Sequence, residues 1–169
     1  MKNIHLIISA ILIAIIHISA CGREPDSLAF LFPETIEGLQ QVQLITGIQA
    51  LKEINKLHGM EIGIIEGGIG TYKTNNGPKT TVWISRSKKA DLAQHQTEIM
   101  IKRMLLSSHS PFHHPAQREL QGINIYQFQG MGQIHYIFCQ NDLVFWISAV
   151  AHQGDAILQA FLPEKKNTD

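Results

Sequence analysis

Three apolar segments near the end of the chain are separated by very short connections. The segments span residues 123–129, 133–139 and 143–150, and the connections are 130–132 and 140–142. Connections of this length can join antiparallel strands, but they leave no room for the crossover that parallel strands need. The three segments therefore predict an antiparallel meander, and the rest of the chain has to pack around it.

A helix is predicted directly after Thr46. Thr46 and Gln49 have the spacing of a capping box, in which each side chain satisfies a backbone amide at the start of a helix. Apolar residues then recur at helical spacing, and Gly59 is a residue type that commonly ends a helix. These apolar residues are Ile48, Leu51, Ile54 and Leu57.

The remaining segments complete the order of elements. Segment 61–73 is rich in Ile and Gly and predicts a bent strand with a bulge near Gly67, and segment 80–84 has the β-branched and aromatic residues of a strand. Two further helices are predicted at 88–106 and 154–162. Segment 107–117 contains Pro111 and Pro115 and is expected to be a loop.

The predicted order of elements is α-β-β-α-β-β-β-α. It indicates an α+β fold in which an antiparallel sheet packs against helices. The order resembles that of the roadblock and profilin-like folds, and a PsbP-like sandwich is the alternative. Because the resemblance lies in element order alone, it implies no function. One domain is expected at residues 28–164, followed by a polar tail at 165–169.

The first 21 residues have the pattern of a secretory signal. Lys2 precedes an apolar run at residues 4–16, which is too short to cross a hydrocarbon core of about 30 Å. The run ends in Ile18-Ser19-Ala20-Cys21, which resembles the lipobox of bacterial lipoproteins. That resemblance implies that residues 1–20 are removed and that Cys21 becomes the lipidated N-terminus, carrying acyl chains such as palmitate.

The resemblance also implies export and attachment to a bacterial membrane. Gly22 stands after Cys21 where Asp would signal inner-membrane retention, so we expect the outer membrane, with the domain facing the periplasm. Residues 21–27 are expected to form a lipidated tether. Only Cys139 is left as a free thiol in the mature chain, so the domain has no internal disulfide and depends on its hydrophobic core.

Charge and composition exclude two broad classes. The 14 basic residues balance the 14 acidic ones, so the chain lacks the excess of Lys and Arg that nucleic-acid binding requires. Residues are 44% hydrophobic and 17% charged, which is typical of a folded domain and excludes intrinsic disorder. No nucleic-acid partner is expected.

Histidine is unusually frequent, with nine residues in the chain. His109, His113 and His114 lie in the proline-bounded loop, and neutral imidazole is a good ligand for Zn, Cu or Ni. Pro111 prevents a helical i, i+4 pair, and the loop has no Cys, Asp or Glu, so a further ligand, His135 or His152, would have to come from elsewhere in the fold. We therefore favour solvated histidines and no metal cofactor, and keep a metal site as the alternative.

Two tryptophans lie in strand segments of similar character, Val82-Trp83-Ile84-Ser85 and Phe145-Trp146-Ile147-Ser148. Burial in the core is the favoured interpretation of both. The alternative is a binding surface on one sheet face, formed by Tyr72, Trp83 and Trp146, for a protein or an apolar ligand.

Two functional hypotheses follow. The first is a non-enzymatic, membrane-anchored envelope lipoprotein that binds a protein partner or serves in assembly. The second is a lipoprotein that binds a metal or a small ligand through the histidine loop. A hydrolase is disfavoured, because the chain has no paired carboxylates and no Gly-x-Ser-x-Gly motif. The glycines at 67–70 lack the following helix and the Lys of a phosphate-binding loop.

Overall fold

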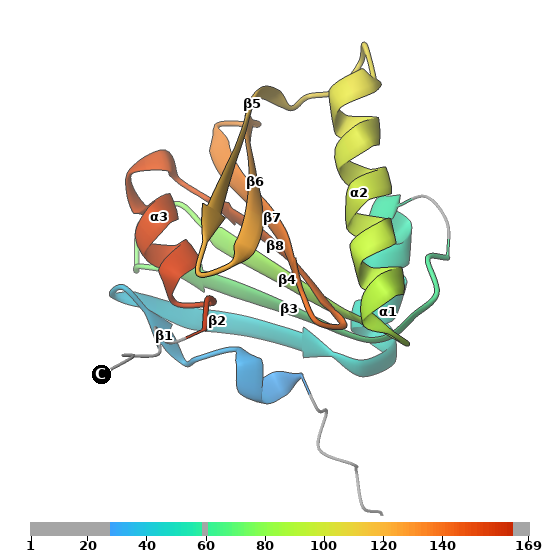
Figure 1. The fold of residues 1–169 in the computed structure, drawn as a ribbon. Helices are drawn as coiled ribbons and strands as arrows, with labels where there is room; N and C mark the ends of the chain where they lie inside the picture. The colour runs from blue at the N-terminus through green and yellow to red at the C-terminus, as the bar shows by residue number, and fades with distance from the viewer. Residues whose placement is uncertain (1–27, 59–60, 164–169) are drawn as a thin grey trace, which may run out of the picture.

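A computed structural model of the chain describes residues 28–58 and 61–163 (Figure 1). The predicted signal peptide, Cys21, the tether at 21–27, Gly59 and the tail at 165–169 lie outside the described residues. In the part of the chain that the structure describes, no helix is both long enough and apolar enough to cross a membrane.

Eight antiparallel strands form one sheet, in the order β1-β2-β3-β4-β8-β7-β6-β5 (Figure 1). The α+β class with an antiparallel sheet is therefore confirmed. The predicted meander is present, extended by one strand, and its last strand pairs with β4 at the centre of the sheet. The strands are β1 (Thr35–Ile36), β2 (Leu39–Thr46), β3 (Ile64–Lys73), β4 (Thr80–Ser87), β5 (His113–Leu120), β6 (Ile123–Gly130), β7 (Gln133–Gln140) and β8 (Leu143–Ala149).

Helices cover both faces of this sheet. One face carries α1 (Gly47–His58) and α2 (Ala90–Leu106), and the other carries α3 (Ala151–Gln159) and the short 3-10 helix η1 (Ala29–Leu31). On the first face, α1 packs on Ile69 and Trp83, and α2 packs on Phe128 and Ile137. The second face holds the largest buried cluster, which includes Phe32 beside η1.

Three strands lie where the sequence did not predict them. β1 and β2 precede α1, and β5 occupies part of the segment expected to be a loop. Pro115 is tolerated in β5 because β5 is at the edge of the sheet, where an outward-facing N–H needs no partner. A bulge lies between His113 and Ala116, and His114 has a φ of 50°. Proline and bulge together leave β5 unsuited to pairing with another strand.

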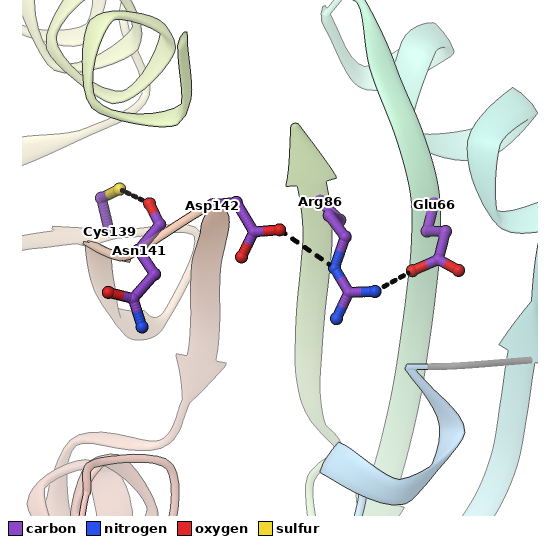
Figure 2. A network of polar contacts seen from close by, with 5 residues as sticks. All are labelled: Glu66, Arg86, Cys139, Asn141 and Asp142. Atoms are coloured by element: carbon purple, nitrogen blue, oxygen red, sulfur yellow. Dashed lines mark hydrogen bonds and ion pairs between the residues drawn. The ribbon is translucent and has the colours of Figure 1, made fainter. Parts of the chain in front are cut away.

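A cluster of charged residues connects three segments at one end of the sheet. Figure 2 shows Arg86 between Glu66 and Asp142, with Nη1 2.6 Å from Glu66 and Nε 3.3 Å from Asp142. Cys139 lies near the end of β7, before the turn that contains Asp142, and donates a hydrogen bond to the Asn141 carbonyl at 3.4 Å. Burial is the main cause that raises the pKa of the half-buried Cys139 thiol, so the thiol stays protonated.

Candidate functional site

A cavity of about 840 Å³ lies on the face of the sheet that carries α1 and α2. The end of α1 and the second half of α2 form one side of it, and strands β4, β7 and β8 form its floor. Pro111 and Phe112, just before β5, form a further wall. The volume lies within the range of about 300–1,000 Å³ that small-molecule sites commonly have.

The two tryptophans of the chain meet on the floor of this cavity. Trp83 of β4 and Trp146 of β8 are direct cross-strand neighbours, and both are half-buried. Phe112 contacts Trp146 edge to face, with ring centroids 5.6 Å apart. The alternative interpretation of the two tryptophans as part of one aromatic surface agrees with this placement, although the surface is the floor of a cavity.

Tyr72 is not part of that surface. Trp83 pairs with Ile69 of β3, so Tyr72, three residues further along β3, points to the opposite face. Its side chain is fully buried there, with 0% exposure, and its hydroxyl accepts a hydrogen bond from Gln41 Nε2 at 3.2 Å. The predicted grouping of Tyr72 with the tryptophans is therefore wrong.

His135 lies at the centre of a buried polar network on the cavity floor. The side chain is 1% exposed, and its Nε2 is 3.0 Å from the carbonyl oxygen of Gly130. Its Nδ1 is 2.9 Å from Ser148 Oγ and 3.2 Å from Trp146 Nε1. A carbonyl can only accept and an indole N–H can only donate. Nε2 therefore carries the proton, and Nδ1 accepts from Ser148 and Trp146.

This network has a nucleophile next to a base but lacks the other parts of a hydrolase site. The group behind His135 is the Gly130 carbonyl and not a carboxylate. Ser148 lies inside β8 between two paired strands, where backbone amides are used by the sheet and are not free to form an oxyanion hole. Burial lowers the pKa of His135, so the neutral ring acts as a fixed hydrogen-bonding group. The arrangement supports a structural role.

The histidines proposed as metal ligands are not brought together as a set. His109 is exposed next to Ser108, and His113 and His114 are exposed neighbours on the edge strand, with their Nδ1 atoms facing each other. His135 is inside the domain, against the ring of Phe112. Among residues 28–58 and 61–163, no three His, Cys, Asp or Glu side chains are placed to hold a metal ion. The placement lends the metal hypothesis no support.

Charged side chains also line the cavity, and the sequence did not indicate them as site residues. Lys79 precedes β4, Arg103 is on α2, and His58 and Glu61 lie at and after the end of α1. Burial and then the positive charge of Arg103 lower the pKa of His58. These residues are far apart in sequence, and only the packing of α1 and α2 over the sheet brings them to one cavity.

Comparisons with known proteins identify no family. No protein-family model matches the chain, and no curated protein matches it. A solved structure described as a GTP binding regulator from Thermotoga maritima aligns with 80% of this chain and 82% of its own length. Its TM-score is 0.47 and its sequence identity is 7%, so it carries no argument about function.

Proposed function

We propose that this protein is a membrane-anchored envelope lipoprotein whose domain binds a small, largely apolar molecule and catalyses no reaction. The observation that carries the proposal is the cavity of about 840 Å³ floored by Trp83 and Trp146. Its other apolar lining residues include Phe112 and the methionines Met100, Met104 and Met131. Such a lining favours the burial of apolar ligand surface, worth about 25 cal/mol per Å².

A protein partner is the second candidate. It is favoured by the exposed apolar residues at the end of α2, where Leu105 and Leu106 are 52% and 72% exposed. These two residues lie outside the cavity and line a separate depression together with Tyr126. The two candidate functions therefore use different surfaces and can be separated by substitution.

The binding proposal predicts that a neutral apolar fluorophore enters the cavity. N-phenyl-1-naphthylamine added to a chain that begins at Gly22 should quench the tryptophan emission, because both tryptophans of the protein lie on the cavity floor. This chain keeps the whole core, since every core residue described lies at or after Leu28. Trp83→Leu should weaken binding by about tenfold, as expected when a central aromatic contact is truncated.

Leu106→Ser is the matched control for that measurement. It also removes a large apolar side chain, but one on the surface outside the cavity. The binding proposal requires that this variant bind the fluorophore as the wild type does. Absence of binding to the wild type, or an equal loss in both variants, would contradict the proposal and favour the protein-binding alternative.

The membrane anchor has its own test. Full-length Cys21→Ala should leave the membrane fraction and lose palmitate labelling, because an acylated N-terminus would be the attachment and each buried methylene contributes about 0.8 kcal/mol. Cell fractionation with labelled palmitate measures both effects. Ser19→Ala, which keeps a small residue before the cysteine, should remain lipidated. Unchanged fractionation of Cys21→Ala would contradict the lipobox assignment.

A further inference from the structure

We infer that the ligand of this cavity is an amphipathic organic anion, with an apolar body on the tryptophan floor and one anionic group held by Arg103, while Lys79 adds positive charge to the same cavity. The inference rests on the proposed function and adds the chemical class of the ligand. Three features of the cavity support it: the polar groups of the floor, the charges among the lining residues and the apolar walls.

Three of the four polar side chains on the floor, those of His135, Ser148 and Gln133, already form hydrogen bonds within the protein, and the fourth is Thr81. His135 donates to Gly130 and accepts from both Ser148 and Trp146. Gln133, which also lines the cavity, donates to the Lys79 carbonyl at 3.0 Å. A polar ligand group placed on this floor would lose hydration and gain few free partners, which is unfavourable. The floor therefore suits an apolar body, and a polar ligand group has to lie elsewhere.

The charged lining residues favour a negative group. Arg103 and Lys79 are cationic, and Glu61 is the acidic residue in the lining. Among the described residues, neither Arg103 nor Lys79 forms an ion pair within 4.0 Å, whereas Arg86 and Arg118 both do. An anion would give these cations charge-assisted hydrogen bonds that the protein does not supply.

The position of Arg103 links the charged and apolar parts of the cavity. Arg103 lies between Met100 and Met104 on α2, and all three line the cavity. Its positive charge also acts on His58 at the end of α1 and, after burial, is the second cause of the lowered pKa of that ring. An anion beside Arg103 would thus keep its apolar body in contact with methionines and tryptophans.

Two fluorophores that differ only in one charged group test this inference. 8-Anilino-1-naphthalenesulfonate has the aromatic body of N-phenyl-1-naphthylamine with an added sulfonate. Wild-type protein should bind the sulfonate about tenfold more tightly than the neutral probe, and this difference in affinity should decrease with added salt. Arg103→Gln should remove most of that preference, because it should weaken binding of the sulfonate much more than binding of the neutral probe. Lys79→Gln should reduce the preference to a smaller extent.

Lys102→Gln is the matched control, since it removes a positive charge from the neighbouring position of α2, outside the cavity. It should retain the preference for the sulfonate, and circular dichroism should show that all variants are folded. Equal affinity for both probes, or equal effects of Arg103→Gln and Lys102→Gln, would overturn the inference alone. Failure of both probes to bind the wild type would overturn the proposed function.

Discussion

Replacing His135 with alanine should lower the free energy of unfolding by about 3 kcal/mol, measured by urea denaturation. The substitution removes the hydrogen-bond partner of Gly130, Ser148 and Trp146 at once. A buried polar group left without a partner costs about 1–3 kcal/mol, and water entering from the cavity offsets part of the total. Loss of the Phe112 ring contact, at a centroid distance of 5.0 Å, adds to the destabilisation.

His152→Ala is the matched control for this prediction. His152 is exposed at the start of α3, so the same substitution there should change the unfolding free energy by less than about 0.5 kcal/mol. Ser148→Ala should fall between the two, because His135 keeps its bonds to Gly130 and Trp146. A His135→Ala protein as stable as His152→Ala would show that the network does not stabilise the fold.

The same histidine gives stability a pH dependence of known sign. Burial lowers the pKa of His135 in the folded protein, so the unfolded chain binds a proton more readily. The contribution of His135 to the free energy of unfolding is complete above the pKa of about 6.5 that histidine has in the unfolded chain. It is lost as the pH falls from there towards the lower pKa of the folded protein. His58 is shifted in the same direction and adds to this loss. Unfolding of His135→Ala should therefore depend less on pH below 6.5 than unfolding of the wild type.

The parts of the fold that could be predicted are those controlled by local signals. Short connections determined the meander, and helical periodicity identified α1 and α2 within a few residues of their observed ends. β2 gave no such signal, because its sequence is rich in Gln and a bulge between Gln41 and Gln43 interrupts the alternation. β5 was missed because Pro115 is a loop signal unless the strand is known to lie at an edge.

The candidate site was predictable only in part, for a similar reason. Trp83 and Trp146 lie in similar sequence segments, which indicated that both belong to strands. Which residues of different strands share a face of the sheet depends on the register between the strands, and local sequence does not determine that register. Tyr72 was therefore grouped with the wrong face. Arg103 and Lys79 reach one cavity through tertiary packing of α2 on the sheet, which no spacing in the sequence encodes.

The glycines of β3 also acquire a physical explanation that the sequence did not offer. α1 approaches Gly67 from one face, and the ring of Phe32 lies against Gly68 and Gly70 on the other. A Cβ on Gly67 would lie 2.7 Å from Ile54 Cδ1, and one on Gly68 would lie 2.4 Å from Phe32 Cε2. The glycines thus let a helix and an aromatic ring pack closely on the strand, which accounts for them without a bound phosphate.

Gly68→Ala should accordingly lower the free energy of unfolding by about 2 kcal/mol. The added methyl group meets a rigid ring in a packed core, and overpacking of this kind costs about 1–3 kcal/mol. Alanine has less conformational freedom than glycine in the unfolded chain, which offsets a part of that cost. Gly67→Ala should cost less, because its methyl group meets the end of the Ile54 side chain, which can rotate away. Urea denaturation of both variants measures the difference.

A double-mutant cycle with Phe32→Leu isolates the cause. Leucine lacks the ring atoms Cε2 and Cζ, which are the two nearest to a Cβ on Gly68. Phe32→Leu alone should destabilise the protein by loss of buried surface, but Gly68→Ala added to it should cost much less than in the wild type. Strictly additive effects would mean that the ring is not what requires glycine at this position. If Phe32→Leu is coupled to Gly68→Ala but not to Gly67→Ala, the cost of the Gly68 substitution comes from contact with the Phe32 ring and not from the strand itself.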